Sequence, residues 1–523
     1  MSHAVPRFVP VLFLGCTAVA LLTAADAPKA PPPPATQWTA RPAESARIAR
    51  MEANLAPLAL PGEKPQALSV QRWMELYGIP GLSVAVYDRN ALVWSKTYGV
   101  TQAGGKEPVT LETLFQAASV SKPVTALAAL RAVEQGRVSL DANVNDALKS
   151  WKVPDNEFTR EQKVTLRRLL SHSAGLTVHG FPGYGAGEPL PTVQQILDGQ
   201  KPANTEAVRV DGVPGTEARY SGGGYVVVQQ LLTDVMKKPF PQLMKEAVLD
   251  PVGMKHSTFE QPLPPALAAR TAAGTRASGE TVEGRWKVYP ELAPAGLWTT
   301  PSDLALLQLE VAKARAGKSK RVLSQAMTQQ MLTKQSGPYG LGYMLDDAPD
   351  RFEHGGWNDG FTAHVVTLGN KGSGIVLMAN SDNGVLLFER LIASIVTEYG
   401  WQPVPDHLKS PVMTADLLSR VKGADAVIAW ARKTKGEGGL PPPVLNHVGY
   451  GLFMSGKVED GLKVFQQNAA LFPDDAEAQD GLGMAYMKAG KKAEALAVYQ
   501  KLLKADPKNE SALRAVKMLS AKP

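Results

Sequence analysis

The chain has 523 residues, 44% of them hydrophobic, and its formal net charge is +7. This length predicts two or three domains, and the modest charge, without basic runs among aromatic residues, argues against nucleic-acid binding. The chain has one cysteine, Cys16, which excludes a disulfide framework and a cysteine-ligated metal centre.

The first 42 residues have the pattern of an export signal followed by a linker. A weakly basic start precedes an apolar run over residues 8–22, and small residues follow up to Ala25. This order predicts a signal peptide over residues 1–25, a proline-rich linker over residues 26–42, and a periplasmic or secreted protein. The run is too short for a convincing membrane span, so we expect none in the mature chain.

Cys16 suggests a second route of processing. It follows Leu14 and Gly15, as a lipoprotein acceptor would, but the apolar run continues past it to Leu22. We therefore favour cleavage after Ala25 over lipid anchoring at Cys16.

The next segment combines a helical pattern with a hairpin. Residues 43–77 have helical periodicity, and two alternating stretches, residues 82–87 and 91–98, flank Asp88-Arg89-Asn90. Alternation interrupted by such a turn predicts two antiparallel strands.

A short stretch after this hairpin carries the first catalytic candidates. Ser119 and Lys122 lie at the start of an apolar helical pattern that continues to Gly136. At a spacing of three residues both side chains share one helix face, so the lysine amine reaches the serine hydroxyl. A helix N-terminus also favours negative charge on the serine oxygen and loss of the lysine proton. The pair is predicted to be a nucleophile and its base.

Two other features compete with this assignment. Ser419 and Lys422 have the same spacing, which arises by chance in a chain of this length, but they lie in a polar helical stretch. His172 lies between two serines at a predicted helix end, and no acid partner is evident. We therefore favour a hydrogen-bonded structural role for His172 and place the nucleophile at Ser119.

Two glycine-containing segments complete the predicted site. Tyr220 precedes the run Gly222-Gly223-Gly224 at the start of an apolar helix, and it is either an acid/base group or a packed aromatic residue. The glycine run suggests a crowded turn that needs positive φ angles. Further on, Gly355 and Gly356 would let a substrate approach the backbone of an edge strand.

These segments, in this order, resemble the serine hydrolase superfamily of penicillin-binding proteins, class C β-lactamases and related esterases. The Ser-x-x-Lys motif of that superfamily matches Ser119 and Lys122, and its catalytic tyrosine matches Tyr220. His354-Gly355-Gly356 occupies the third motif, usually Lys-Thr-Gly or His-x-Gly. The second motif usually ends in an asparagine two residues after the tyrosine, where this chain has Gly222.

The resemblance covers residues 43–402, with further structural signatures at residues 170–176 and 296–304. It implies fold class α+β: a mixed antiparallel sheet flanked by helices, with an all-helical subdomain inserted between Gly136 and about Pro290.

The resemblance also implies acyl transfer without a metal or cofactor. Ser119 would attack a carbonyl group while Lys122 and Tyr220 move its proton. The backbone N–H groups of Ser119 and Trp357 would form the oxyanion hole, and His354 would orient the substrate or steer a carboxylate.

The C-terminal part of the chain repeats with a period of 34 residues. Residues 403–443 are predicted to be a helical linker with one helical stretch over residues 413–433. Beyond it, Gly449 recurs as Gly483 and Phe465 as Tyr499, a spacing typical of tetratricopeptide repeats. Residues 444–523 are therefore predicted to be an all-α repeat segment that binds a protein or peptide or supports the enzyme structurally.

Three functions remain open. The first is an exported serine hydrolase that cleaves a small ester, amide or peptide through a Ser119 acyl-enzyme. The second is a β-lactamase or D-alanyl-D-alanine-type peptidase, which Gly222 disfavours because an asparagine there can bond the substrate amide. The third is a catalytically silent envelope protein that binds a partner through its repeats, against which the intact Ser119 and Lys122 argue.

Overall fold

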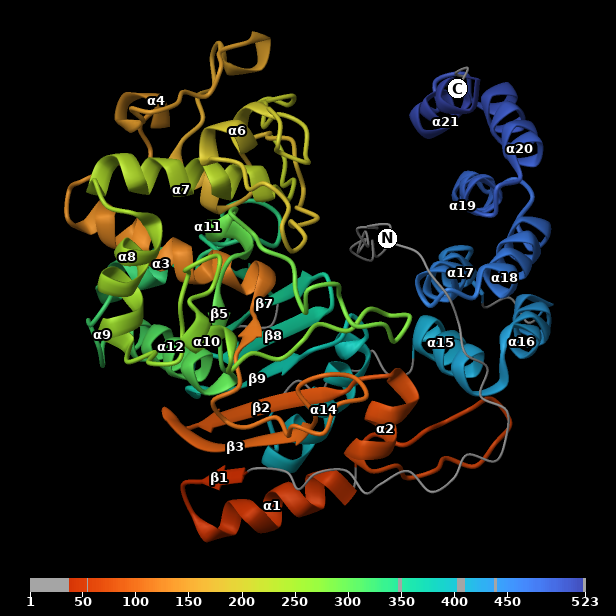
Figure 1. Ribbon diagram of the computed structural model, residues 1–523, viewed down its shortest axis with the longest axis horizontal. Helices are drawn as coiled ribbons and strands as arrows, with labels where there is room; N and C mark the ends of the chain where they lie inside the picture. Colours follow the sequence, from red (N-terminus) through yellow and green to blue (C-terminus); the bar gives the residue numbers. More distant parts are fainter. Residues whose placement is uncertain (1–36, 54, 347–349, 402–409, 437–439, 521–523) are drawn as a thin grey trace, which may run out of the picture. The chain divides into compact units, whose positions relative to one another are not determined.

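The computed structural model describes residues 37–53, 55–346, 350–401, 410–436 and 440–520. The predicted signal peptide over residues 1–25, Cys16 and most of the predicted linker lie outside these described residues. The described chain divides into two compact units (Figure 1). The larger unit comprises the described residues up to Pro57 and those from Ala67 to Trp401.

The larger unit contains an antiparallel sheet with the strand order β1-β3-β2-β9-β8-β7-β6. Its strands are β1 Gln37–Thr39, β2 Gly81–Asp88, β3 Ala91–Gly99, β6 Met344–Leu345, β7 Arg351–Asn358, β8 Phe361–Leu368 and β9 Ser373–Ala379. The predicted hairpin is therefore present as β2 and β3. A separate pair joins β4 Phe115–Gln116 to β5 Trp298–Thr299.

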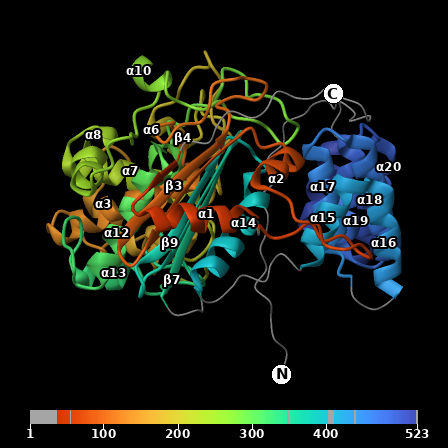
Figure 2. The ribbon, with the colours of Figure 1, turned by 90° about the horizontal axis from the view of Figure 1, so that it is seen from below.

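Both faces of the sheet centre are covered. Side chains alternate between the two faces of a strand, yet every residue of β9 is buried, as expected for a strand with helices on both sides. The helices that pack on β9 are α12 Pro301–Arg315 and α14 Gly384–Tyr399, and Figure 2 shows α1 and α14 on the near face of the sheet. The core of this unit therefore lies between sheet and helices.

Many of the remaining helices of the larger unit lie in the segment inserted between Gly136 and Pro290. In chain order, the remaining helices are α1 Pro42–Ala53, α2 Val70–Tyr77, η1 Ala118–Val120, α3 Ser121–Glu134, α4 Val144–Ala147, η2 Glu157–Thr159, α5 Leu166–Leu170, α6 Val193–Asp198, α7 Gly222–Met236, α8 Phe240–Met244, η3 Lys245–Leu249, α9 Asp250–Val252, α10 Pro265–Ala268, α11 Leu292–Ala295 and α13 Gln325–Met331. The predicted fold class, an antiparallel sheet with flanking helices and an inserted helical region, is confirmed.

The segment between α1 and α2 differs from the continuous helical pattern expected over residues 43–77. Pro57, Pro61 and Pro65 remove backbone donors and prevent a helix from continuing. By its contacts, Leu58–Gln66 belongs to the second unit, although the sequence placed it within the predicted hydrolase domain over residues 43–402.

The second unit is all-helical apart from this segment. Its helices are α15 Pro411–Lys422, α16 Ala424–Gly436, α17 Pro443–Met454, α18 Val458–Leu471, α19 Ala476–Lys488, α20 Lys492–Ala505 and α21 Glu510–Ser520. The helical stretch expected over residues 413–433 is divided at Gly423, whose φ of 86° suits glycine. Because α15 packs on α17 and α16 packs on α18, the described part of the predicted linker over residues 403–443 belongs to this helical unit.

The 34-residue period has a direct packing cause. A Cβ atom on Gly449 would lie 2.6 Å from the ring of Phe465, and one on Gly483 would lie 2.7 Å from the ring of Tyr499. Each glycine therefore receives the aromatic ring of the following helix at equivalent positions of two repeats. None of the described helices is both long enough and apolar enough to cross a membrane.

Candidate active site

The loop that carries Ser119 is fixed by backbone hydrogen bonds before α3 begins. Ala117 donates to the carbonyl oxygen of Leu297 over 2.9 Å. In return, Leu297 donates to Oγ of Ser121 over 3.0 Å, and that hydroxyl donates to the Ala118 carbonyl over 2.6 Å. Ala118 has a φ of 49°, an uncommon conformation for a non-glycine residue. The surrounding bonds thus hold a strained turn beside the nucleophile.

Ser119 and Lys122 meet in the predicted manner. The Nζ atom of Lys122 donates to Oγ of Ser119 over 2.9 Å and to the carbonyl oxygen of Pro294 over 3.0 Å. Only 2% of Lys122 is exposed, and burial lowers its pKa to about 7 because a low-dielectric site disfavours the charged form. A lysine with this pKa is partly neutral near pH 7 and can accept a proton from the serine.

The second Ser-x-x-Lys pair has a different environment. Lys422 Nζ lies 3.1 Å from a carboxylate oxygen of Glu63, and 47% of the lysine side chain is exposed. Lys422 is therefore a surface ion-pair residue, unlike the buried Lys122.

Tyr220 lies beside both members of the first pair. The Lys122 Nζ atom is 4.8 Å from the centroid of the Tyr220 ring, and the Tyr220 side chain hydrogen-bonds Ser119. Burial raises the pKa of Tyr220 well above its ordinary value, and the bond to Ser119 offsets only part of this effect. At neutral pH Tyr220 is therefore a protonated phenol that can pass a proton to or from the serine oxygen.

His172 packs against the ring of Tyr220. Its ring stacks on the Tyr220 ring with a centroid separation of 4.3 Å, and its Nδ1 atom accepts a hydrogen bond from the Ser221 N–H over 3.1 Å. Burial, followed by the nearby charge of Lys122, lowers the pKa of His172 well below its ordinary value. The geometry gives this neutral ring a positioning role.

Strand β7 packs against the turn η1 that carries Ser119. The short strand β6 pairs only with Phe352 and Glu353, so this pairing does not extend along β7 to Gly356. A Cβ atom on Gly356 would lie 2.3 Å from the Ala117 carbonyl oxygen and 3.1 Å from the Ser119 nitrogen. Glycine at this position therefore lets the strand backbone approach Ser119, whereas a Cβ atom on Gly355 would come no closer than 3.8 Å to any neighbour.

His354 lies in β7 and is buried. Its Nδ1 atom is 2.6 Å from the Gly355 carbonyl oxygen, and since a carbonyl only accepts, Nδ1 carries the proton. Nε2 has no hydrogen-bond partner among the described residues. Burial and the charge of Lys122 lower the pKa of His354 to about 3. The neutral ring can orient a substrate through a hydrogen bond but has no charge with which to steer a carboxylate.

Trp357 is partly exposed at the end of the same strand, with 37% of its surface accessible. Its side chain hydrogen-bonds the buried carboxylate of Asp382, which also accepts from the Gly360 N–H over 2.7 Å. Burial raises the pKa of Asp382 to about 7 against the effect of these donors. Asp382 thus anchors the turn after β7 and the indole that borders the site.

Gly222 begins α7, at the position where the superfamily usually has asparagine. A Cβ atom there would lie 2.9 Å from the Phe181 ring and 3.0 Å from the His179 carbonyl oxygen. The predicted crowding is present, but Gly222, Gly223 and Gly224 are not among the glycines with positive φ. A side chain at position 222 would therefore clash with neighbouring atoms, although the backbone conformation there would allow one.

Sequence reasoning missed several residues of this site. The Pro294 carbonyl that binds Lys122 carries no side-chain signal. Tyr339 approaches the His172 ring edge-on at 4.9 Å, and His179 lies 4.8 Å from the Tyr220 ring. Tyr339 and His179 both lie in loops that contain no known sequence motif. The glycine run at residues 222–224 indicated only that some other segment packs closely against the start of α7.

Comparison with known proteins identifies the families of both units. The Beta-lactamase family matches residues 69–395, and a tetratricopeptide repeat family matches residues 449–510. The chain belongs to the β-lactamase family. The structure thus combines a penicillin-binding-protein-like or β-lactamase-like serine hydrolase unit with a helical repeat region.

Curated relatives of this β-lactamase-family chain are distant. It is 23% identical over 345 residues to Protein flp of Staphylococcus aureus strain MW2, an alignment that covers 62% of this chain and 65% of that protein. It is 25% identical over 354 residues to Unguisins hydrolase ungD of Aspergillus violaceofuscus, covering 59% of each. The chain therefore spans about two thirds or less of the length of these relatives.

Solved structures share the fold. The octameric penicillin-binding protein homologue from Pyrococcus abyssi matches with a TM-score of 0.54 and 21% identity, covering 66% of this chain and 78% of that one. The penicillin-binding protein from Bacillus halodurans matches with a TM-score of 0.51 and 21% identity, covering 63% and 98%.

Proposed function

We propose that this β-lactamase-family chain is a serine hydrolase that cleaves an activated ester or a reactive amide through an acyl-enzyme on Ser119. The observation that carries the proposal is the 2.9 Å hydrogen bond between Lys122 and Ser119, made by a lysine whose pKa burial lowers to about 7. A serine hydroxyl is a weak nucleophile until an adjacent base removes its proton, and Lys122 provides that base.

The first chemical step is attack on the carbonyl carbon. Neutral Lys122 accepts the Ser119 proton as Oγ forms the new bond, and the carbonyl oxygen becomes an oxyanion. The backbone N–H groups of Ser119 and Trp357 stabilise it, and one such donor typically contributes about 3–4 kcal/mol. The support for this pair is the close approach of Gly356 to the Ser119 nitrogen.

The second step releases the leaving group. Tyr220, which is protonated and hydrogen-bonded to Ser119, donates to the departing oxygen or nitrogen, and its proton is replaced from Lys122. Water then attacks the acyl-enzyme with the same groups acting in reverse, which regenerates Ser119 and frees the acid.

The proposed preference for esters rests on Gly222. An asparagine at this position could hydrogen-bond an amide of the substrate, and a site built around such a bond discriminates strongly against substrates that lack it. Glycine offers no side chain. An activated ester has a better leaving group than an amide, so it depends less on this contact.

A β-lactamase or D-alanyl-D-alanine-type peptidase is the alternative, and the names of the solved penicillin-binding relatives favour it. The test is parallel labelling with a fluorescent phosphonate and a fluorescent penicillin, followed by kinetics with p-nitrophenyl acetate and a cephalosporin. We expect phosphonate on Ser119 and a higher kcat/KM for the ester. Efficient cephalosporin hydrolysis with negligible esterase activity would support the alternative.

Ser119→Ala and Ser419→Ala form a matched pair for this test. Each removes the serine of one Ser-x-x-Lys pair. We expect Ser119→Ala to abolish labelling and Ser419→Ala to leave both labelling and hydrolysis unchanged. Label mapped to a peptide without Ser119 would refute the assignment.

We further propose that the protein is exported and that the mature chain begins near Asp26. The support is the basic start, apolar run and small residues of the first 25 positions. Mass spectrometry of protein recovered from the envelope or medium tests this. A diacylated N-terminal Cys16 would instead support a lipoprotein.

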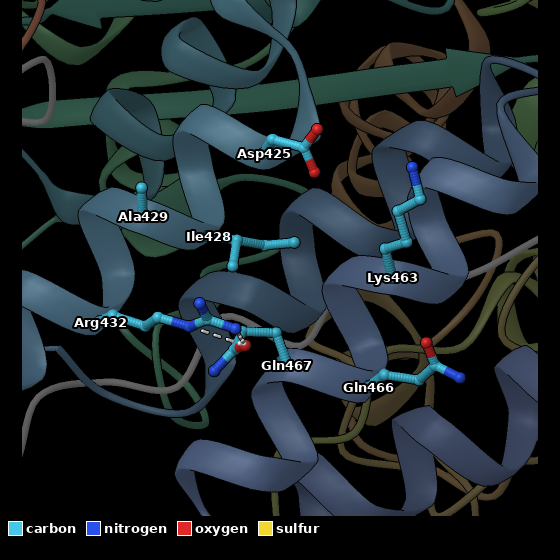
Figure 3. A pocket seen from close by; sticks show the side chains of 7 residues that line it. All are labelled: Asp425, Ile428, Ala429, Arg432, Lys463, Gln466 and Gln467. Atoms are coloured by element: carbon cyan, nitrogen blue, oxygen red, sulfur yellow. Dashed lines mark hydrogen bonds between the residues drawn. The ribbon is translucent and has the colours of Figure 1, made fainter.

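The helical unit is proposed to bind a protein or peptide partner, as its repeat family suggests. A hollow of about 460 Å³ between α16 and α18 supports this proposal (Figure 3). It is lined by Asp425, Ile428, Ala429, Arg432, Lys463, Gln466 and Gln467. Replacing Gln466 with a photo-crosslinking residue tests whether a partner occupies the hollow, while Lys463→Glu should reduce crosslinking without changing ester hydrolysis. Unchanged crosslinking in Lys463→Glu would count against this surface.

A further inference from the structure

The loop over residues 177–181 is clamped to the first turn of α7. The Ser221 hydroxyl donates to the Thr177 carbonyl over 2.7 Å. The N–H of Gly222 donates to the His179 carbonyl over 3.0 Å, and that of Gly223 to the Val178 carbonyl over 2.9 Å. First-turn N–H groups have no partner within their own helix. Two carbonyl groups of this loop accept from such N–H groups of α7, and a third accepts from the hydroxyl of the N-cap residue Ser221.

The clamp depends on the glycine run. A Cβ atom on Gly222 would meet the Phe181 ring at 2.9 Å, and one on Gly223 would meet the Thr177 carbonyl oxygen at 2.9 Å. The loop therefore occupies the volume that a side chain at position 222 would need. Glycine at position 222 and the close approach of residues 177–181 are therefore parts of one arrangement.

The backbone of this loop is strained at the residue before His179. Val178 has a φ of 60°, which is an outlier for a β-branched side chain. Such conformations cost free energy and persist where the surrounding structure enforces them, often beside a functional site. Here the hydrogen bonds from α7 enforce it, and the chain direction after Val178 places His179 at the rim of the site.

The His179 ring lies next to the reacting groups. It is partly exposed, its centroid is 4.8 Å from that of Tyr220, and it hydrogen-bonds the Tyr220 backbone. Partial burial and the charge of Lys122 lower the pKa of His179, so the ring is neutral at pH 7. One nitrogen is used by the Tyr220 backbone, and the opposite nitrogen is available for a hydrogen bond to a ligand.

We propose that His179 is a specificity-determining residue, whose imidazole contacts the acyl part of the substrate in place of the asparagine amide usual at position 222. This inference rests on the proposed acyl transfer at Ser119. The substrate class is an ester whose acyl group carries a hydrogen-bonding amide or hydroxyl close to the scissile carbonyl. A purely aliphatic acyl chain has no group that can form a hydrogen bond with the imidazole.

The test compares two activated esters with the same leaving group, p-nitrophenyl N-acetylglycinate and p-nitrophenyl butyrate. We expect His179→Ala and His179→Phe to lower kcat/KM for the N-acetylglycinate by about 3- to 10-fold, the value of one hydrogen bond, mainly through a higher KM. The butyrate should change less than this. His179→Phe keeps an aromatic ring against Tyr220, and His179→Gln should restore part of the lost discrimination.

Three outcomes are distinguishable. Wild-type kcat/KM values for both esters in His179→Phe would overturn the inference while leaving the Ser119 mechanism intact. An equal loss on both esters would assign His179 a structural role and also overturn it. Absence of phosphonate on Ser119 in the wild-type protein would refute the proposed function, and the inference would fail with it.

Discussion

Gly356 and Ala117 approach so closely that a Cβ atom on Gly356 would lie 2.3 Å from the Ala117 carbonyl oxygen. Gly356→Ala should therefore displace β7 from the nucleophile loop, lower the free energy of unfolding by about 2 kcal/mol and strongly reduce acylation. Gly355→Ala is the matched control, because its Cβ atom would meet nothing within 3.8 Å. Thermal unfolding and phosphonate labelling measure both effects, and equal melting temperatures for the two variants would contradict the prediction.

The pH dependence of acylation should report Lys122. Burial lowers its pKa to about 7, and only the neutral amine accepts the serine proton. Values of kcat/KM for p-nitrophenyl acetate should therefore rise through about pH 7 and level off above it. Lys122→Ala should lose about 10²- to 10⁴-fold in kcat/KM, and the residual rate should no longer show this step. A wild-type profile that is flat from pH 5 to 9 would contradict the role of Lys122.

The free energy of unfolding should also depend on Lys122, in the pH range between its folded and unfolded pKa values. Unfolded Lys122 keeps its proton up to its ordinary pKa of 10.5, whereas folded Lys122 releases it near 7. Between these values the unfolded state binds more protons, so wild-type stability should gain a contribution of up to about 1.4 kcal/mol per pH unit as pH rises. Lys122→Met removes this contribution. Urea unfolding of both proteins at pH 7 and pH 9 measures it, and parallel changes in the two would argue against a buried, shifted lysine.

Tyr220→Phe should slow substrates according to their leaving groups. p-Nitrophenolate departs without protonation, whereas an amine or an alkoxide needs a proton from Tyr220. The loss in kcat/KM should therefore be larger for a methyl ester or an amide than for a p-nitrophenyl ester. Tyr339→Phe is the comparison: its ring centroid lies 4.9 Å from that of His172 and 6.3 Å from that of Tyr220, and the change keeps this ring packing while removing only the hydroxyl group. An equal loss on all substrates would assign Tyr220 to packing.

Gly222→Asn should fail to create lactam recognition. The added side chain would collide with the Phe181 ring, 2.9 Å from its Cβ atom, and such overpacking typically costs about 1–3 kcal/mol. We expect a lower melting temperature and no gain in cephalosporin hydrolysis, with partial recovery of stability when Phe181→Ala is combined with it. A stable Gly222→Asn variant with increased lactam turnover would contradict this prediction and would show that the loop over residues 177–181 can move to accommodate the side chain.

Some of the fold could be read from local patterns. Alternation on either side of Asp88-Arg89-Asn90 predicted the hairpin, because a strand shows its period within a few residues. Ser119 and Lys122 could be paired because one helix turn fixes their spacing. The repeats were visible because Gly449 and Gly483 each accommodate the ring of a following helix.

Other features depend on contacts that no local pattern encodes. Pro294 contributes a backbone oxygen to Lys122 from 172 residues away, and any residue type supplies a carbonyl group. His179 reaches Tyr220 only because Val178 is held in an unfavourable conformation by α7. The helical pattern over residues 43–77 concealed the break that the prolines after α1 cause, and nothing in it could indicate that Leu58–Gln66 packs with the C-terminal helices.

That early segment affects how the protein can be made and divided. During synthesis Leu58–Gln66 leaves the ribosome long before residues 410–520 exist, so the helical unit cannot be completed until translation of the chain is nearly finished. The residues of the larger unit are therefore all synthesised before the helices on which Leu58–Gln66 packs. A single cut after Trp401 would not separate the two units either, since Leu58–Gln66 would stay with the larger unit, apart from the helices on which it packs.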